Sequence, residues 1–252
     1  MEQSIKQYIR SIQLNRDKIP SFKKYPFCLP AIRSLDTLNL HPKVTFIIGE
    51  NGTGKSTILE AIAVAYGFNP EGGTKNFNFQ SSNTHSDLYE YFKLIKGIKI
   101  PKDGFFLRAE SFYNFATNVD ELNEEDKKTG NPELLLSYGG QSLHKQSHGE
   151  SFFAVFINRF RGKGLYILDE PEAALSPTRQ MSMISRIHEL VEQDSQFIIA
   201  THSSIIMAYP HSKIYEIKEG LKEVEYEETE HYQVMSSFLN NKEKMLSILM
   251  EN

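Results

Sequence analysis

The chain has 252 residues, of which 40% are hydrophobic, enough to bury one substantial core with or without a small subdomain. Its net charge of −4 gives no global excess of positive charge, so composition does not support nucleic-acid binding, and only a local basic patch keeps that partner open. The single cysteine, Cys28, excludes an intramolecular disulfide framework and a cysteine zinc cluster, and it suits the reducing cytoplasm, where we expect the protein to act.

The sequence predicts neither a targeting segment nor membrane insertion. Residues 1–6 are polar and lack the apolar core of a signal peptide. No apolar run approaches the roughly 20 residues that a membrane-spanning helix needs. Two extended segments are predicted next, an edge strand at 5–14 and a second segment at 26–32, whose prolines also favour an edge position.

The stretch Gly49–Thr57 fits the phosphate-binding P-loop pattern G-x-x-x-x-G-K-[ST]. The apolar run 44–48 before it predicts a buried strand, and residues 58–66 after it predict a helix that ends at Gly67. Strand, glycine loop and helix together form a phosphate cradle, because backbone N–H groups and the positive end of the helix dipole face the anion. The predicted nucleotide-binding residues are Asn51, Gly52, Thr53, Gly54, Lys55, Ser56 and Thr57.

Two side chains of this loop have predicted roles of their own, with ATP as substrate and Mg²⁺ as cofactor. Lys55 is expected to reach the β- and γ-phosphates, and the Ser56 hydroxyl is expected to ligate Mg²⁺. Upstream, Phe22, Tyr25 and Phe27 form an aromatic cluster. Ordinary packing remains the alternative for each of them, and Tyr25 is our candidate for stacking on an adenine ring.

The segment at about 70–160 is predicted to be a mostly helical subdomain inserted into a single nucleotide-binding domain, 1–252. It contains no internal repeat and no heptad pattern. Its expected elements are a helix at 86–96, a strand at 105–110, a helix at 114–122 and a charged connection at 121–130.

Ser147, Gly149 and Glu150 precede a strongly apolar helix at 152–160. A serine and a glycine at a helix start offer a hydroxyl, free N–H groups and the positive dipole end to an anion. Taken alone, this segment is no more than a helix N-cap.

The apolar run 165–168 predicts a buried strand that ends in two carboxylates, Asp169 and Glu170. An aspartate at this position is the Walker B pattern, and it is expected to hold Mg²⁺ opposite Ser56. Glu170 can accept a proton from an attacking water. Ser176, with a proline after it, predicts the start of the next helix.

A further buried strand is predicted at 197–200, and His202 follows it at the edge where ligands of open α/β sheets bind. The other histidines, His231 among them, have no such placement and receive no role. The remaining chain predicts a hairpin at 214–224 and one C-terminal helix at 231–250.

Taken together, these motifs resemble an ABC-type ATPase over residues 44–202. Asn51 and Gly52 stand in the P-loop as they do in ABC proteins, and the segment 147–150 resembles the signature motif L-S-G-G-Q. The segment 169–171 resembles the ABC Walker B with its catalytic glutamate, and His202 resembles the switch histidine. The order and separation of the four motifs are close to those of the family.

Several departures set the chain apart from transporter subunits. His148 replaces the first signature glycine, Glu150 replaces the usual glutamine, and Ser176 replaces the aspartate of the D-loop. The Q-loop glutamine has two candidates, Glu110 and Gln80. The closest resemblance is to the small stand-alone bacterial predicted ATPases of the soluble SMC/RecF-like AAA/ABC group.

The resemblance implies an α/β P-loop NTPase fold of ABC type, with a mixed or parallel sheet core and a mostly helical insertion between P-loop and signature. It implies Glu170, His202 and Lys55 as catalytic residues. It also implies a head-to-tail homodimer, in which Ser147, Gly149 and Glu150 of one subunit contact the nucleotide of the other.

Three functions follow as hypotheses. The first is an ATP-hydrolysing dimerisation switch for an unidentified protein partner, in DNA maintenance or defence. The second is the nucleotide-binding subunit of an ABC transporter. The third, a DNA-binding ATPase of the SMC type, is disfavoured because the chain between Lys55 and Ser147 is too short for a long coiled coil.

Overall fold

In this computed structural model, the structure describes residues 7–75, 86–129, 134–145, 148–173 and 175–250. The strands are β1 (Ile9–Leu14), β2 (Thr37–Asn39), β3 (Val44–Gly49), β4 (Phe92–Lys96), β5 (Asp103–Arg108), β6 (Gly164–Asp169), β7 (Gln196–Ala200), β8 (Lys213–Ile217) and β9 (Leu221–Val224). The α-helices are α1 (Pro30–Arg33), α2 (Lys55–Tyr66), α3 (Phe112–Thr129), α4 (His148–Arg159), α5 (Pro177–Glu192), α6 (Glu230–Asn240) and α7 (Lys242–Met250).

The fold is a layered α/β arrangement, as the sequence predicted, and its strands form two sheets. The larger sheet has six strands in the order β5-β6-β7-β3-β8-β9, and the smaller has three in the order β2-β1-β4. All neighbours in the larger sheet are parallel except β8 and β9, which form the predicted antiparallel hairpin. Every residue of β3, β6 and β7 is buried, as expected for parallel strands covered on both faces.

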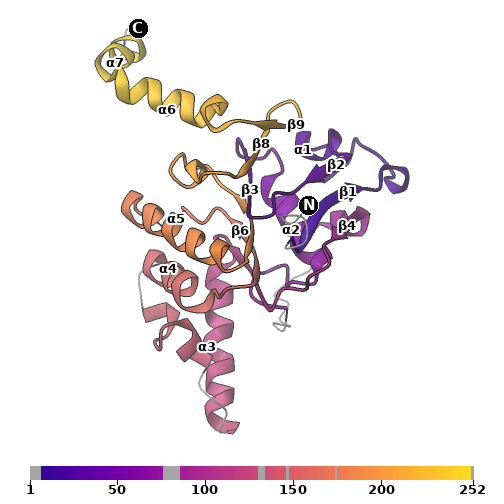
Figure 1. Ribbon diagram of the computed structural model, residues 1–252, viewed down its shortest axis with the longest axis vertical. Helices are drawn as coiled ribbons and strands as arrows, with labels where there is room; N and C mark the ends of the chain where they lie inside the picture. The colour runs from indigo at the N-terminus through magenta and orange to yellow at the C-terminus, as the bar shows by residue number, and fades with distance from the viewer. Residues whose placement is uncertain (1–6, 76–85, 130–133, 146–147, 174, 251–252) are drawn as a thin grey trace.

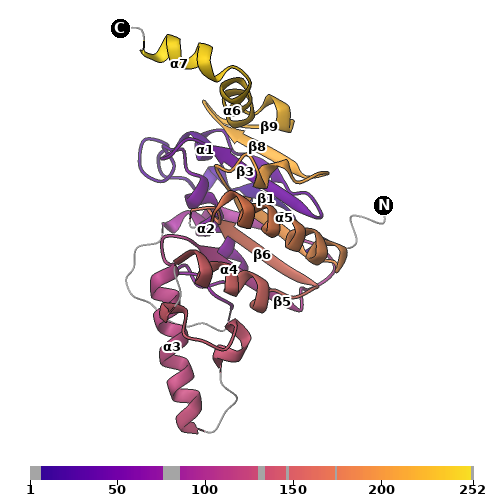
Figure 2. The same ribbon diagram turned by 90° about the vertical axis from the view of Figure 1, so that its left-hand side faces the viewer.

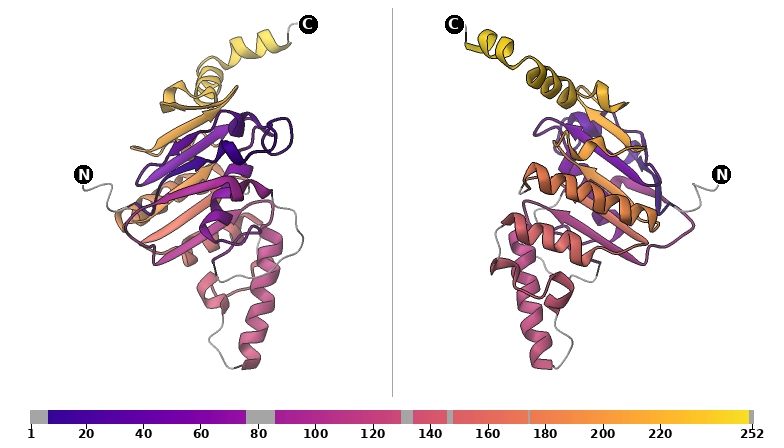
Figure 3. Two further views of the ribbon diagram at one scale, coloured as in Figure 1. Left: turned by 90° about the vertical axis from the view of Figure 1, so that its right-hand side faces the viewer. Right: turned by 60° about the vertical axis from the view of Figure 1, so that its left-hand side comes forward.

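Two hydrophobic cores lie on opposite faces of the larger sheet. One packs α3, α4 and α5 against alternate strand residues such as Phe46, Tyr166 and Phe197. The other packs α2 and the smaller sheet against the strand residues that point to the opposite face of the larger sheet, such as Ile47 and Ile167. Helices α4 and α5 cover one face in Figure 2, and the smaller sheet and α2 lie on the other side in the left view of Figure 3.

Buried Gln196 joins the smaller sheet to the larger one. Its side-chain Oε1 accepts hydrogen bonds from the backbone N–H groups of Tyr8 and Ile9, both at 3.0 Å. Its Nε2 donates to the carbonyls of Ile9 at 2.9 Å and His41 at 3.0 Å. All the hydrogen-bonding capacity of this buried amide is therefore spent on fixing β1 beside the start of β7.

The parallel strands end at one common edge of the sheet, and this edge positions the site. Strand β3 ends at Gly49, β6 at Asp169 and β7 at Ala200, directly before Thr201 and His202. Strand β5, beside β6, ends there at Arg108. Loops from four strands thus meet where ligands of open α/β sheets bind.

Three predicted elements near the smaller sheet are wrong. The segment 86–96 was expected to be a helix, but its second half is strand β4, because pairing with β1 overrides the helical spacing of its apolar residues. The segment 5–14 was expected to be an edge strand, but β1 lies between β2 and β4. The segment 26–32 is not extended, since Pro30 starts the short helix α1, where a proline at the first position costs no hydrogen bond.

Two other predictions fail at helix boundaries. The charged segment 121–130 was expected to be a solvated connection, but α3 continues through it to Thr129. The segment 231–250 was expected to be one helix, but it breaks at Asn241, whose φ of −134° leaves the helical region. Figure 1 shows the result: α3 projects from one end of the molecule, and α6 and α7 project from the other.

The boundary of a helical subdomain at about 70–160 stays a prediction. Strands β4 and β5 fall inside that range and belong to the two sheets, whereas α3 and α4 make up its helical part. Among the helices of the described residues, none combines the length and apolar character that crossing a bilayer requires.

Candidate nucleotide-binding site

The P-loop joins the end of β3 to the start of α2. Gly54 is the N-cap of α2, with a left-handed φ of 106°. A Cβ at this position would lie 3.2 Å from Cδ1 of Leu29, so both the backbone angle and the close packing require glycine. The first turn of α2 therefore points its N–H groups into the loop, as an anion site needs.

Lys55, the first residue of α2, is 4% exposed. Its Nζ donates a hydrogen bond to the backbone carbonyl of Glu50 at 3.0 Å. Burial lowers the pKa of Lys55, while the nearby carboxylates of Glu170, Asp169 and Glu172 act in the opposite direction. A buried cation with few polar partners is well suited to a phosphate group, since weak screening strengthens the attraction.

Ser56 and Asp169 meet across the site. The Ser56 hydroxyl donates to Oδ1 of Asp169 at 2.9 Å. Burial raises the pKa of Asp169 to about 6, although Arg108 and the hydrogen bond from Ser56 oppose the shift. A hydroxyl and a buried carboxylate are hard oxygen ligands, so these two residues fit Mg²⁺.

Arg108 was not predicted as a site residue, yet it joins three carboxylates. Its Nη1 lies 2.7 Å from Oε2 of Glu60 on α2, and its Nη2 lies 3.2 Å from Oε2 of Glu110. Its Nε lies 3.6 Å from Oδ2 of Asp169. The sequence shows an arginine after the apolar run 105–107, but it does not show that this strand lies beside the acidic strand β6.

Glu170 follows Asp169 in a strained conformation. Its φ of 51° is in the left-handed region, which is uncommon for a residue other than glycine. The backbone N–H of Glu170 donates to the carbonyl of Ala200 at 2.9 Å, which holds the turn in place. Such conformations are kept where surrounding contacts impose them, often at functional sites, and here the strain turns the carboxylate toward the histidine loop.

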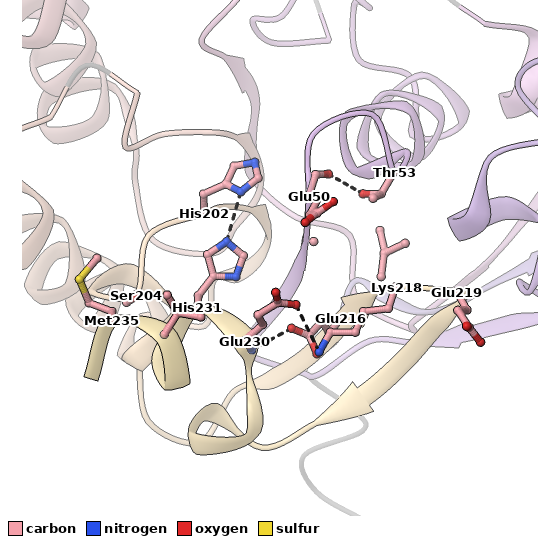
Figure 4. A pocket seen from close by; sticks show the side chains of 13 residues that line it. Glu50, Thr53, His202, Ser204, Glu216, Lys218, Glu219, Glu230, His231 and Met235 are labelled. Atoms are coloured by element: carbon pink, nitrogen blue, oxygen red, sulfur yellow. Dashed lines mark hydrogen bonds and ion pairs between the residues drawn. The ribbon is translucent and has the colours of Figure 1, made fainter. Parts of the chain in front are cut away.

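His202 lies beside Glu170 and connects to two residues that were not predicted. Its Nε2 lies 3.4 Å from Oε1 of Glu170. Its backbone N–H donates to the carboxylate of Glu172, whose pKa is raised by burial. On the other side of the ring, Nδ1 of His202 lies 3.3 Å from Nε2 of His231, as Figure 4 shows. The second glutamate of Glu-Pro-Glu was visible in the sequence, whereas nothing local indicated His231.

A cavity of about 400 Å³ brings most of the predicted P-loop residues together with Glu170. Tyr25 and Glu110 also line it, and Tyr25 is 64% exposed, which leaves its ring accessible for stacking. Phe27 packs edge-on against Tyr91 in the core instead. Of the two Q-loop candidates, Glu110 lines this cavity and Gln80 lies outside the described residues.

Thr53 faces a neighbouring cavity of about 570 Å³ rather than the first one. Its hydroxyl donates to the carbonyl of Glu50 at 2.8 Å. His202, His231 and Lys218 also line this second cavity, which Figure 4 shows. The two cavities therefore flank the P-loop, with His202 on the side of α6.

Of the predicted signature residues that the structure describes, Glu150 lines a separate cavity of about 590 Å³ and Gly149 does not. Gly149 lies in the first turn of α4, and Glu150, which lines this cavity, lies 3.6 Å from Arg179. Ser147 lies outside the described residues. Within one chain, then, Glu150 lines a different cavity from the P-loop residues.

Comparison with known proteins assigns the chain to a family. The family model described as "RecF/RecN/SMC N terminal domain" matches residues 27–224. A relative from Caldanaerobacter subterraneus subsp. tengcongensis, provisionally named an ABC transporter ATP-binding protein, is 27% identical over 212 residues, 74% of this chain and 82% of its own length.

Two further relatives have names that assign them to import systems. The petrobactin import ATP-binding protein of Bacillus anthracis is 26% identical over 66% of this chain and 64% of its own length. The xylose/arabinose import ATP-binding protein of Sulfolobus acidocaldarius is 26% identical over 82% of this chain and 90% of its own length.

The chain is also similar to solved structures, at lower identity. The SMC head domain from Thermotoga maritima is 17% identical, with a TM-score of 0.44 over 87% of this chain and all of that one. The ADP conformation of an ATP-binding cassette of an ABC transporter is 19% identical, with a TM-score of 0.46 over 98% of this chain and 99% of that one.

Proposed function

Because this chain belongs to the RecF/RecN/SMC N-terminal domain family of ABC-type ATPases, we propose that it binds ATP with Mg²⁺ and hydrolyses it to ADP and phosphate. We place this reaction in the cytoplasm, within an ATP-dependent homodimer that acts as a switch for a protein partner. One observation carries the proposal: Lys55 with Ser56 and Asp169 with Glu170, from two separate segments of the chain, converge at the carboxyl edge of the sheet.

The residues divide the chemistry among them. Lys55 and the N–H groups of α2 would hold the β- and γ-phosphates in the cavity that Glu170 also lines. Ser56 and Asp169 would hold Mg²⁺, which would supply positive charge to the phosphate oxygens. Glu170, whose side chain is 36% exposed, accepts a proton from the attacking water. His202, 3.4 Å from that carboxylate, keeps it directed at the water and contacts the γ-phosphate.

The proposed dimer is supported by the position of Glu150, which lines a different cavity from the P-loop residues. A helix N-terminus with Ser147, Gly149 and Glu150 can bind phosphate only if a nucleotide is brought to it. In a head-to-tail dimer, the partner subunit brings its own ATP to that helix. Each charge-assisted hydrogen bond contributes about 1.5–3 kcal/mol, so losing several of them after hydrolysis releases the dimer.

Lys55→Ala tests nucleotide binding directly. The variant should lose measurable ATP binding in calorimetry, because it lacks the one side-chain cation that the P-loop offers to the phosphates. Lys43→Ala is the matched control, since Lys43 is exposed and pairs with Glu192 at the start of β3. Micromolar ATP affinity retained in Lys55→Ala would contradict the nucleotide site.

A second function, the nucleotide-binding subunit of an ABC transporter, is favoured by the import relatives reported above. The two functions differ in the partner, a permease or a non-membrane protein. Chemical cross-linking in the native cells, followed by identification of the cross-linked protein, separates them. A multi-spanning permease supports the transporter function, and a protein without membrane spans supports the switch.

A further inference from the structure

The contact between His202 and His231 joins the catalytic edge to the C-terminal helices. His231 is the second residue of α6, and its Nε2 lies 3.3 Å from Nδ1 of His202. Nδ1 of His231 is buried and makes no hydrogen bond to another described residue. The bond to His202 is therefore the polar contact that the structure gives the His231 ring.

Hydrogen bonds at the first turn of α6 fix the position of His231. Thr229, the N-cap of α6, is fully buried, and its side chain accepts a hydrogen bond from the N–H of Tyr232 at 3.2 Å. The N–H of Glu230 donates to Oε1 of Glu216 at 3.0 Å, at the end of β8. None of the residues of α6 is buried, so the helix is anchored through its first turn.

Hydrogen-bond chemistry assigns the tautomers of the two rings. Nε2 of His202 makes no hydrogen bond to another described residue, but it lies 3.4 Å from the carboxylate of Glu170, and a negative charge at that distance favours an N–H over a lone pair on Nε2. Nδ1 of the neutral His202 ring is then an acceptor, and the hydrogen between the two rings must lie on Nε2 of His231. Burial and the nearby Lys55 lower the pKa of His202, which is consistent with a neutral ring.

We infer that His231 is a positioning residue: by donating to Nδ1, it fixes His202 in the tautomer and orientation that present an N–H to Glu170 and to the γ-phosphate. The inference rests on the proposed function, because it assigns a task to the switch histidine. Helix α6 is then coupled to the carboxylate of Glu170 through the hydrogen bond between His231 and His202. A movement of α6 away from the sheet breaks this bond and slows hydrolysis without removing a P-loop contact.

Two substitutions at one position separate positioning from packing. In His231→Gln the side-chain amide still donates to Nδ1 of His202, whereas in His231→Phe a ring of similar shape cannot. We expect kcat to fall about 10-fold or more in the phenylalanine variant, with unchanged KM, and to stay within about threefold of wild type in the glutamine variant. His188→Phe is the control, since His188 is exposed on α5 beside Tyr209, and it should keep the wild-type kcat.

Nitrogen-15 NMR of the histidine rings provides a readout independent of turnover. Wild type should show His202 protonated on Nε2, and His231→Phe should show a mixture of tautomers. Wild-type His202 protonated on Nδ1, an unchanged kcat in His231→Phe, or equal losses in the two variants would each overturn the inference. A wild type without ATPase activity would contradict the proposed function, while the NMR result would still decide the histidine contact.

Discussion

Burial disfavours the charged form of Asp169, the form that the proposed function requires. Its carboxylate is 3% exposed, and burial raises its pKa from 3.8 to about 6. At neutral pH the charge therefore costs the folded protein on the order of 3 kcal/mol, at 1.36 kcal/mol per pKa unit. In the proposed function the same charge would hold Mg²⁺, so stability would be given up for cofactor binding.

Asp169→Asn should accordingly raise the melting temperature while weakening Mg²⁺ binding. A carboxyl whose pKa is higher in the folded state stabilises the fold when protonated, below its unfolded pKa of 3.8, and that contribution is lost as the pH rises through about 6. The variant should therefore match wild type near pH 4 and melt several degrees higher above pH 7. Calorimetry without nucleotide and Mg²⁺ measures this difference.

The exposed Asp87 supplies the control for that experiment. Asp87→Asn removes the same charge at a position open to solvent, so its melting temperature should stay close to wild type at both pH values. A lower melting temperature for Asp169→Asn at neutral pH would contradict the view that the buried charge is costly.

Sequence reasoning identified the residues whose chemistry is local to a motif. Lys55, Ser56, Asp169 and Glu170 follow strands whose apolar runs are unmistakable, so their common edge could be predicted before their contacts were known. Arg108 and His231 were missed because their contacts depend on which strand pairs with β6 and on where α6 begins. Those are properties of the assembled fold, and no short pattern encodes them.

At the scale of elements, the ion pair between Arg108 and Glu60 connects the central sheet to the P-loop helix. Glu60 lies in α2 and Arg108 ends β5, and their side chains are 11% and 15% exposed. Glu60 also accepts a hydrogen bond from the N–H of Ser86 at 3.1 Å. The ion pair thus fixes α2, whose N-terminus belongs to the P-loop, relative to the end of strand β5.

Breaking this pair from either side should be costly, and removing both charges should cost less than the sum. Arg108→Met should reduce the free energy of unfolding by about 3–5 kcal/mol, because it leaves the carboxylates of Glu60 and Asp169 without their cation. Glu60→Gln should cost less, because Arg108 keeps Glu110 and Asp169 as partners. The double variant should recover part of that loss, with a coupling of about 0.5–3 kcal/mol in urea titrations.

An exposed ion pair on α3 serves as the comparison. Lys127 and Glu124, 3.0 Å apart, are 43% and 62% exposed, and an equivalent cycle there should give a coupling below about 1 kcal/mol. Additive losses for Glu60 and Arg108 would show that the two residues do not act as a pair.

In each mispredicted element, the surrounding structure decided the conformation and the local sequence pattern did not. In the segment 92–96 the apolar spacing suits a helix, but backbone pairing with β1 decides in favour of a strand. In α3 the charged residues 121–129 predicted a loop, although a helix that projects from the body tolerates charge all around its surface. The local sequence pattern predicted the structure correctly for β3, β6 and β7, whose continuous apolar runs are buried on both faces of the sheet.

At the scale of the whole molecule, the arrangement suggests how hydrolysis would be transmitted. The nucleotide cavity lies at the carboxyl edge of the sheet, and the cavity lined by Glu150 lies apart from it, near α4 and α5. Two projecting parts, α3 at one end and α6 with α7 at the other, extend from this body. The proposed dimer would join the two kinds of cavity, and its opening would move these projections relative to each other.

Glu170→Gln tests the proposed switch most directly. The amide is nearly isosteric with the carboxylate but cannot take a proton from water, so turnover should fall about 10²–10⁴-fold. The phosphate contacts that join two subunits are retained, and the variant should accumulate as a dimer. Ser147→Arg in the same background should prevent dimerisation, because the substituted residue belongs to the surface that meets the partner's nucleotide.

The decisive measurement is the molar mass of Glu170→Gln by light scattering with ATP and Mg²⁺. The account predicts twice the chain mass of 28.9 kDa with ATP and the mass of a single chain with ADP. A single-chain mass at saturating ATP and Mg²⁺ would contradict it and would leave a P-loop protein that binds nucleotide without the switch.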